Sequence, residues 1–409
     1  MNFSYHSILF FIHLSALLMN PNASPSYTIG SSRFTKVSSP LFKDSSATME
    51  LDDVKIATTP NVVVSQDGKG NFKKIMDAIA AAPSQLSSKH FVILVKKGVY
   101  KEYVNIDKTK SNIILIGEGK DATIISGSKS VGGGQATFDT ATFAVRAQGF
   151  VAMDIGFENT ADPKSGQAVA VQSSGDRSVF YRCKISGNQD TLLVQAGRQF
   201  FRECQIIGSI DFIFGYGTAV FQKCDIYIKK SQIGGTTVIT ANGRNSSTDS
   251  SGFSFQLCTI HGDPQSPTGP TSVTPRGVYL GRSWGTYART VFMQSSISSI
   301  LSPQGWLQWN DVPVDKLYFG EYQNSGPGAA LGGRVTWPGF HKMSAADADK
   351  FTVAKFIDGD SWLPALVAEL GFQNSTTLTS PLEKMKFSCV IPFLSIAIIC
   401  FFALFTNTC

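Results

Sequence analysis

The chain has 409 residues, 43% of them hydrophobic and 16% charged, and 36 Lys and Arg against 30 Asp and Glu give it a formal net charge of +6. So small an excess does not indicate a partner nucleic acid, although an acidic polymer could hold a mildly basic secreted protein. The length, the hydrophobic content and the 37 glycines favour one all-β domain of about 300 residues with tight corners.

Two segments at the start of the chain, residues 1–24 and 25–58, differ in composition from the residues that follow. Residues 1–24 are expected to be a secretory signal peptide, because the apolar run Ile8–Leu18 is shorter than a membrane span and is followed by small and turn residues. Residues 25–58 are rich in Ser, Thr and Pro and are expected to form a leader without a packed core. The ordered domain is therefore predicted to cover residues 59–365.

Local patterns place helices near both ends of this domain. Apolar residues on one face predict a helix over 71–82, which would cap the open end of a stack of strands. At the other end, Ser344 and Asp347 have the spacing of a capping box and predict a helix through Phe356. Short apolar runs predict strands at Val62–Val64, Phe91–Val95 and Ile113–Ile116.

A six-residue pattern, Phe-x-x-Cys-x-Ile, recurs through the middle of the chain. Its spacing varies while the pattern stays constant, which is typical of a solenoid whose strands are joined by loops of different length. Alternating apolar and polar residues favour strands, so the predicted fold is a parallel β-helix. The copies, with Met153 or Ser295 replacing cysteine in two of them, begin at Phe150, Phe180, Phe201, Phe221, Phe255 and Phe292.

Two acids occupy one position in successive copies. Cys183 and Cys204 are 21 residues apart, and so are Asp190 and Asp211. Neighbouring strands lie roughly 4.7–4.9 Å apart, so the two carboxyl groups should lie side by side and one should keep its proton at higher pH than the other. Gln189 adds an amide donor. An anionic nucleophile, a protonated acid and neutral donors are the groups that acyl transfer requires.

Other chemistry has weaker support. No cluster of His, Cys and acidic residues has metal-ligand spacing, so neither a metal site nor a cofactor is expected. The segment around Ser283 matches Gly-x-Ser-x-Gly, but that motif needs a strand-to-helix turn that the surrounding pattern does not predict. Asn245 and Asn374 begin possible N-glycosylation sites. Four body cysteines allow two disulfides or a buried ladder of thiols: Cys183, Cys204, Cys224 and Cys258.

The C-terminal segment, residues 366–409, is expected to serve attachment to a membrane. Val390–Phe405 is almost wholly apolar and is preceded by Lys384 and Lys386. Small residues, a polar spacer and a terminal apolar tail favour a removable glycolipid-anchor signal, and a membrane-spanning tail is the alternative.

From about Asn61 to Pro364, the chain resembles the catalytic domain of plant pectin methylesterases. The resemblance implies a right-handed parallel β-helix, and the local patterns described above add short helices that cap its two ends. The matching blocks are Gly98–Glu102, Gln167–Ala170, Gln189–Leu192, Asp211–Gly215, Leu280–Trp284 and Trp337–His341.

The resemblance also implies roles for individual residues. Asp211 would attack the methyl-ester carbonyl of galacturonate, and Asp190 would protonate the departing methanol and then activate water. Gln167 and Gln189 would stabilise the oxyanion and Gln167 would also contact substrate. Arg282 would hydrogen-bond Asp211. Trp284 would pack against the sugar, since residues two apart on a strand share a face.

Three positions depart from the family pattern. Asn188 and Leu193 stand where aromatic residues usually line the cleft, and Ser283 stands where proline is usual. The resemblance therefore implies retained chemistry with altered substrate affinity or pattern preference. Residues 25–58 are too few for the N-terminal inhibitor-like domain of many relatives, so self-inhibition is not expected, and a separate inhibitor protein is a possible partner.

Pectin would be the substrate, and the protein would act outside the cell, in the wall or at the outer face of the plasma membrane. Two other functions remain open. One is a glycosidase of polygalacturonase type, which also uses paired carboxylates on a β-helix. The other is a pectin-binding wall protein with impaired catalysis, which the missing aromatic residues favour.

Overall fold

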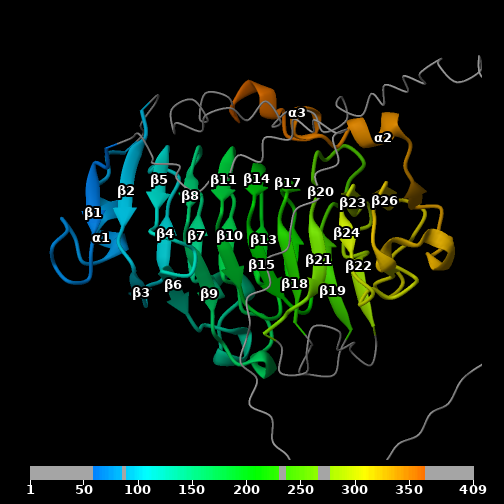
Figure 1. Cartoon of the computed structure of the whole chain (residues 1–409), viewed down its shortest axis with the longest axis horizontal. Coiled ribbons are helices and arrows are strands. Elements are labelled where there is room, and N and C mark those ends of the chain that lie inside the picture. The colour runs from blue at the N-terminus through cyan, green and yellow to red at the C-terminus, as the bar shows by residue number, and fades with distance from the viewer. Residues whose placement is uncertain (1–58, 85–88, 230–235, 266–276, 364–409) are drawn as a thin grey trace, which may run out of the picture. The chain divides into compact units, whose positions relative to one another are not determined.

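The computed structural model describes residues 59–84, 89–229, 236–265 and 277–363. From β2 to β25, successive coils each add one strand to each of three parallel sheets, here named sheets A, B and C, and β1, β26 and β27 extend sheet A alone (Figure 1). The predicted parallel β-helix is confirmed. The expected signal peptide, leader, tail and Asn374 lie outside the described residues. Within the described ranges, no helix is long and apolar enough to cross a membrane.

The three sheets share one order of coils, and their strands have the following bounds. Sheet A contains β1 (Val62–Val64), β2 (Phe91–Val95), β5 (Ile113–Ile116), β8 (Val151–Met153), β11 (Ser178–Tyr181), β14 (Arg198–Arg202), β17 (Thr218–Gln222), β20 (Gly252–Gln256), β23 (Arg289–Met293), β26 (Tyr318–Tyr322) and β27 (Phe340–Lys342). Sheet B contains β3 (Gly98–Tyr100), β6 (Thr123–Gly127), β9 (Gly156–Asn159), β12 (Lys184–Ser186), β15 (Gln205–Gly208), β18 (Asp225–Ile228), β21 (Thr259–Gly262) and β24 (Ser296–Ile297). Sheet C contains β4 (Val104–Ile106), β7 (Phe143–Val145), β10 (Val171–Ser173), β13 (Leu192–Val194), β16 (Ile213–Gly215), β19 (Thr237–Asn242), β22 (Val278–Arg282) and β25 (Trp306–Leu307).

The repeated phenylalanines form one stacked ladder inside the coil. Phe180, Phe201, Phe221, Phe255 and Phe292 pair in register, and their ring centroids are 4.8, 4.7, 4.5 and 4.4 Å apart in that order. The stacking continues from coil to coil because parallel strands in register bring identical side chains together. The repeat in the sequence is thus a repeat of core positions.

The cysteines of the repeat lie in the same core as free, buried thiols. Their S–H groups donate to backbone carbonyls, as Cys204 Sγ does to the Phe180 oxygen at 3.3 Å. Burial raises the pKa of the Cys204 and Cys258 thiols well above the usual value. The structure therefore favours the thiol ladder over the two disulfides.

One copy of the repeat was assigned the wrong register. Phe180 pairs with Ala152 rather than with Phe150, and Ile185 pairs with Phe157 rather than with Ile155. Phe150 and Ile155 are nevertheless both fully buried. Because a shift by two residues keeps the same side chains pointing inward, the apolar pattern alone could not fix this register.

The helix α1 (Ile75–Ala81) packs against β1, β2 and β4 and covers the N-terminal end of the coil, as predicted (Figure 1). It is shorter than expected because the carboxylate of Glu102 accepts the backbone N–H groups of Ile75 and Met76, at 3.1 and 3.2 Å. This side chain satisfies the free donors of the first turn and so fixes where the helix starts.

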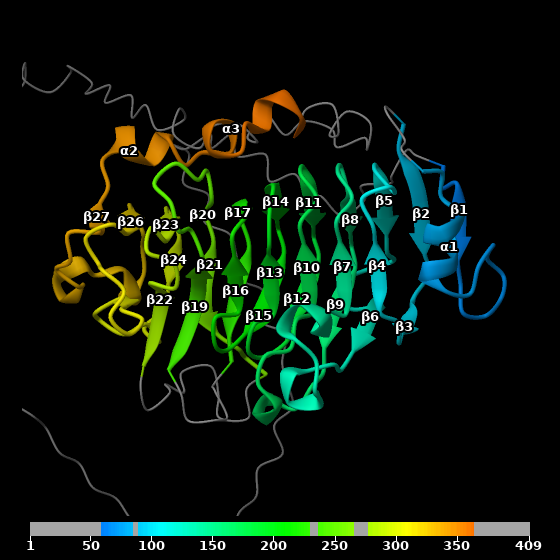
Figure 2. The same ribbon diagram turned by 180° about the vertical axis from the view of Figure 1, so that it is seen from behind.

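The C-terminal helices lie along the side of the coil. The capping box of Ser344 and Asp347 is present, but the predicted helix is split into α2 (Ala345–Asp349) and α3 (Val353–Phe356), since Thr352 caps a second start. The Phe351 carbonyl accepts hydrogen bonds from Ser254 Oγ and Gln256 Nε2, at 2.9 and 2.7 Å. The expectation that this helix closes the far end is therefore wrong, because the segment covers the outer face of sheet A (Figures 1 and 2). Short 3₁₀ helices lie at Val131–Gly133, Thr137–Thr140, Pro163–Ser165, Pro327–Ala329, Leu331–Gly333 and Gly359–Ser361.

Replacing Phe201 with leucine is expected to lower the free energy of unfolding by about 1–2 kcal/mol, because two stacked ring pairs are lost from a fully buried position. Denaturant unfolding of the wild type and the variant measures this change. Phe138→Leu, at a ring that is 45% exposed, is the matched control. Equal effects of the two substitutions would contradict a stabilising ladder.

Candidate active site

Asp190 and Asp211 lie at equivalent points of neighbouring coils. Each residue comes two positions before a strand of sheet C, and these strands, β13 and β16, pair through Leu192 and Ile213. The Asp190 N–H donates to the Ile210 carbonyl at 3.0 Å. The two strands lie side by side in Figure 2, which views the molecule from behind. The structure thus brings together the two acids that the 21-residue step selected.

Both acids adopt a left-handed backbone conformation, with φ of 61° for Asp190 and 48° for Asp211. Aspartate is one of the few residues other than glycine that enters this region readily. The turn allows each side chain to lie at the start of a strand rather than follow the alternation of the strand itself. Both carboxyl groups are largely buried, with 9% of Asp190 and 4% of Asp211 exposed.

Arg282 reaches Asp211 from two strands away in sheet C. It ends β22, and its Nε donates to Asp211 Oδ1 at 2.7 Å while Nη2 binds Oδ2. The intervening strand β19 places Ala241 beside Arg282, since Thr240 pairs with Gly281. This small residue lets the guanidinium cross the sheet and hold both carboxylate oxygens in the geometry typical of strong Arg–carboxylate pairs.

The environment separates the two acids electrostatically. Burial, then the charge of Asp211, raises the pKa of Asp190 well above its usual value, and the opposing effect of Arg282 is smaller than either. Burial also raises the pKa of Asp211, but Arg282 acts against it through charge and through hydrogen bonds. Asp211 is therefore the acid that ionises first, and Asp190 is the acid that keeps its proton.

The two glutamines also occupy equivalent points of neighbouring coils. The Ala168 N–H donates to the Gln189 carbonyl at 3.1 Å, which sets Gln167 one coil before Gln189. The Gln167 backbone is held in turn, because its carbonyl accepts from the Val131 N–H at 3.0 Å. Both side chains are half-buried, and their amides make no hydrogen bond to any other residue that the structure describes. Two glutamine amides on neighbouring coils, one of them directly before Asp190 in the chain, are thus available to a ligand.

Trp284 reaches the site, but not for the reason that the sequence suggested. The strand β22 ends at Arg282, and a tight turn follows in which the Trp284 N–H donates to the Arg282 carbonyl at 2.9 Å. The Trp284 ring packs against Phe214 and Tyr216, with centroids 6.1 and 4.9 Å away. The turn, rather than the alternation of a strand, therefore brings the indole next to β16.

The three departures from the family pattern have clear surroundings. Asn188 donates through Nδ2 to the Ala161 carbonyl at 3.3 Å, and Leu193 is fully buried in an apolar cluster with Phe214 and Ala241. Ser283 is also fully buried, and its Oγ accepts the Trp309 N–H at 2.8 Å. The strand β23 follows this segment, with no helix between, so the serine-nucleophile motif lacks its required setting.

Two aromatic residues at the site were missed. The central guanidinium carbon of Arg282 lies 3.5 Å from the centroid of the Trp309 ring, and Tyr216 is 42% exposed beside Trp284. Trp309 follows the two-residue strand β25, and no spacing in the sequence links it to Arg282. Tyr216 directly follows the Asp211–Gly215 block, which was the one available signal.

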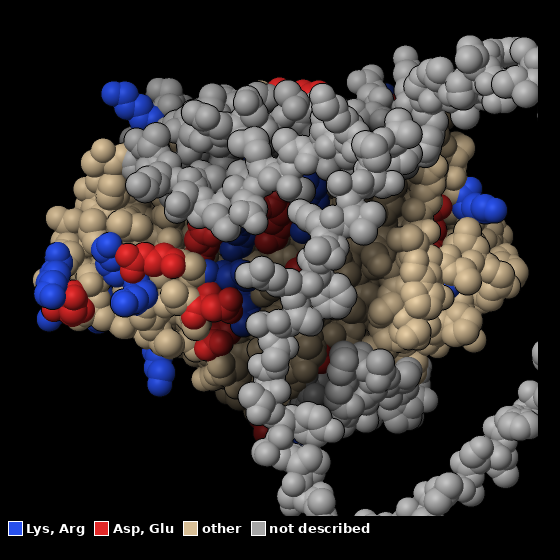
Figure 3. Space-filling model, viewed as in Figure 1, with Lys and Arg blue, Asp and Glu red and all other residues tan. Residues whose placement is uncertain are grey.

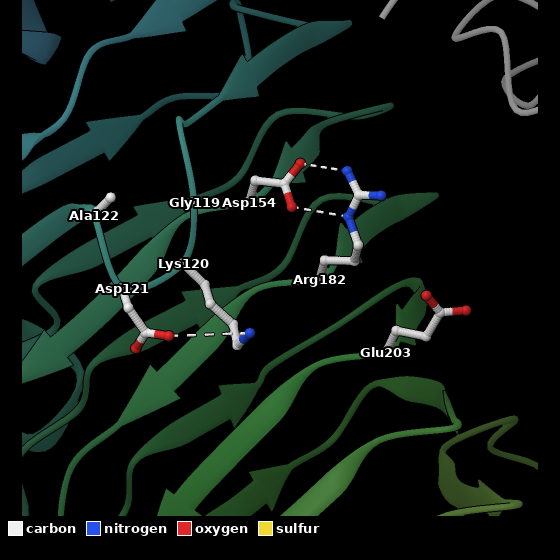
Figure 4. A pocket seen from close by; sticks show the side chains of 7 residues that line it. All are labelled: Gly119, Lys120, Asp121, Ala122, Asp154, Arg182 and Glu203. Atoms are coloured by element: carbon white, nitrogen blue, oxygen red, sulfur yellow. Dashed lines mark hydrogen bonds and ion pairs between the residues drawn. The ribbon is translucent and has the colours of Figure 1, made fainter. Parts of the chain in front are cut away.

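A shallow, open pocket lies elsewhere, at the corner between sheets A and B. It has a volume of about 530 Å³ and is lined mainly by charged side chains (Figure 4). Asp154 and Arg182 form a bidentate pair there at 2.8 and 2.6 Å, and Lys184 binds Asp121 at 2.9 Å beside it. Because these charges are paired with one another, the corner offers none of the free groups found beside Asp190.

In Figure 3, acidic and basic side chains are interspersed on the visible face rather than gathered into one patch.

Across the described ranges, no group of three or more His, Cys, Asp or Glu side chains could hold a metal ion.

Comparisons with known proteins agree with this geometry. Residues 61–360 match the pectinesterase family model. A pectinesterase/pectinesterase inhibitor of Prunus persica is 50% identical over 307 residues, which are 75% of this chain and 58% of that protein, so the chain spans less than two thirds of this relative. The structure of pectin methylesterase from carrot aligns with a TM-score of 0.72 at 45% identity, covering 75% of this chain and 96% of that one. A pectin methylesterase in complex with a hexasaccharide aligns with a TM-score of 0.62 at 29% identity, covering 74% of this chain and 98% of that one. The chain belongs to the pectinesterase family.

Proposed function

We propose that the protein is a pectin methylesterase, which hydrolyses the methyl esters of homogalacturonan to free carboxylates and methanol. The observation that carries this proposal is the buried acid pair, in which Arg282 holds Asp211 and Asp190 keeps its proton. An ionised and a protonated carboxyl group in adjacent coils supply a nucleophile and an acid to the same bond. Membership of the pectinesterase family supports the same activity.

In the first half of the reaction, the Asp211 carboxylate attacks the ester carbonyl carbon. The resulting oxyanion accepts hydrogen bonds from the side-chain amides of Gln167 and Gln189, which have no other partner in the described chain. The tetrahedral intermediate then breaks its bond to the methoxy oxygen, and Asp190 gives that oxygen its proton, so that methanol leaves. A mixed anhydride joins Asp211 to the galacturonate carbonyl.

In the second half, Asp190 is ionised and accepts a proton from water, whose oxygen attacks the anhydride. The bond to Asp211 breaks and releases the galacturonate as its free acid, which then loses its proton to water. Asp211 returns as a carboxylate and Asp190 as an acid, so the sum is one ester and one water converted to one acid and one methanol. Arg282 keeps Asp211 oriented through both halves.

Trp284, with Tyr216 beside it, provides an aromatic surface against which a sugar ring would pack. The structure of a related pectin methylesterase in complex with a hexasaccharide supports an extended oligosaccharide as ligand. The substrate polymer and its position in the plant cell wall follow from this activity. The same proposal places the catalytic domain at residues 59–365 and membrane attachment in residues 366–409. It also includes a separate inhibitor protein as a partner.

The pectin-binding protein with impaired catalysis remains the second candidate. The observation that favours it is Leu193, which is fully buried in the apolar cluster where the family usually exposes an aromatic ring. The acid pair and its arginine are complete, however, so we expect the change to alter affinity rather than remove the reaction.

Methanol release and new reducing ends, measured in the same reaction on highly methylated pectin, separate these functions. The protein expressed from the full-length sequence is expected to release methanol without new reducing ends. New reducing ends would indicate a glycosidase, and pectin binding without either product would indicate a binding protein.

The pH dependence of kcat/KM is expected to be bell-shaped. Asp211 acts as a carboxylate, so activity is lost as the pH falls through its pKa; Asp190 acts as an acid, so activity is lost as the pH rises through its pKa. Because the pKa of Asp190 is raised well above the usual value, the alkaline limb lies above the normal range of a carboxyl group. A pH–rate profile of Asp190→Asn tests this assignment, since its residual activity should lack the alkaline limb. An unchanged limb would assign that titration to another group.

A further inference from the structure

Ser283 makes two hydrogen bonds to the segment that carries Trp309. Its N–H donates to the Leu307 carbonyl at 3.2 Å, and its Oγ accepts the Trp309 N–H at 2.8 Å. The side chain is fully buried, so solvent does not compete for these bonds. A proline at this position could make neither bond because it has no N–H and no hydroxyl.

The segment held in this way turns immediately after Trp309. The Val312 N–H donates to the Trp309 carbonyl at 3.1 Å, and Gln308 Nε2 donates to the Val312 carbonyl at 3.0 Å. Asn310, within the turn, has a φ of 47°. The turn is thus stabilised by its own hydrogen bonds, and Ser283 joins it to the end of β22 by two more.

The Arg282 guanidinium lies over the Trp309 ring. The central carbon of Arg282 is 3.5 Å from the ring centroid, and the Nε and Nη2 atoms of the same group bind Asp211. A ring in this position limits how far the guanidinium can turn, and a bidentate bond requires two N–H groups to face both carboxylate oxygens. The contacts therefore run from Ser283 to Trp309, then to Arg282 and Asp211.

We propose that Ser283 is a positioning residue for the reaction, which holds Trp309 against Arg282 and so fixes the orientation in which Arg282 binds Asp211. This inference rests on the proposed function, in which Asp211 is the nucleophile. Ser283 touches no reacting atom and acts only through the two side chains between.

Arg282 is the charged group that lowers the pKa of Asp211, and the charge of Asp211 in turn raises the pKa of the neighbouring Asp190. When Arg282 is no longer held in its orientation, it stabilises the Asp211 carboxylate less, so the pKa of Asp211 rises. Since Asp211 acts ionised, the acid limb of the pH–rate profile moves to higher pH. A substitution that only weakened the fold would leave this limb unchanged.

Ser283→Ala tests the proposal in the protein expressed from the full-length sequence, because it removes the hydroxyl and keeps the N–H. We expect kcat/KM to fall about threefold to tenfold, mainly in kcat, as for the loss of one hydrogen bond, with the acid limb shifted upward. Ser283→Thr should restore both. The matched control is Ser295→Ala, which removes another fully buried hydroxyl, one that accepts the Cys258 N–H at 3.1 Å and lies at the other side of the coil.

An acid limb that stays in place in Ser283→Ala, with only a loss of thermal stability like that of Ser295→Ala, would overturn the proposal. Crystal structures of the wild type and of Ser283→Ala give a second readout that needs no activity. They should show Trp309 displaced and Arg282 released from one oxygen of Asp211, and an unchanged Arg282 would refute the inference. A wild-type protein that releases no methanol would instead refute the proposed function, whatever the crystal structures show.

Discussion

Asp211→Asn is expected to lower the rate of methanol release by at least about 1,000-fold. The asparagine amide is not a nucleophile, and it cannot accept both Arg282 donors as the carboxylate does. Residual activity would come from binding and from the oxyanion donors alone. Initial rates on highly methylated pectin at saturating substrate measure the effect on kcat.

Asp154→Asn is a closely matched control for this substitution. Asp154 also has a left-handed backbone, with a φ of 55°, and also forms a bidentate pair with an arginine, Arg182. It lies at the corner between sheets A and B, away from the acid pair. Asp154→Asn should retain nearly full activity, and a loss comparable to that of Asp211→Asn would mean that damage to the coil explains both.

Arg282→Gln is expected to lower kcat by roughly 100-fold to 1,000-fold. Removing one partner of a buried ion pair leaves the other uncompensated, which costs about 3–5 kcal/mol, and about 1.4 kcal/mol corresponds to a tenfold change. The pKa of Asp211 should rise because burial then acts without the opposing cation. The acid limb of the pH–rate profile should therefore move to higher pH, by more than in Ser283→Ala.

Arg182→Gln controls for the loss of an arginine from a bidentate pair, since Arg182 binds Asp154 at 2.8 and 2.6 Å outside the site. It should leave both kcat and the acid limb unchanged. Arg282→Lys should lie between the wild type and Arg282→Gln, because lysine keeps the charge but not the fork of donors. If Arg282→Gln lowered activity without moving the acid limb, Arg282 would not set the pKa of Asp211.

The features that the sequence predicted, the β-helix and the acid pair, depend on side chains that have the same environment in every coil. The Phe-x-x-Cys-x-Ile pattern recurs because each coil buries the same positions, so the β-helix could be recognised from it. The sequence could place Asp190 next to Asp211 because each acid follows its copy of the pattern at the same distance along the chain. Where successive coils have the same length, residues at the same position of the repeat lie next to each other in the structure.

The parts that it could not predict depend on contacts between segments of different coils. The start of α1 is set by the carboxylate of Glu102, which comes from another element. The register at Phe150 was wrong because two alternatives bury the same kind of residue. Trp309 meets Arg282 through a turn that follows β25, and only the folded coil brings the two together.

The most direct test of the account is the mass of a methylated oligogalacturonate of defined length before and after incubation with the wild-type protein. We expect an unchanged number of sugar units, with the mass lower by one methylene for each ester hydrolysed and one methanol released for each. Oligosaccharides that become shorter, or that stay intact with every ester retained, would contradict the proposal that Asp190 and Asp211 act as the acid and the nucleophile of a pectin methylesterase.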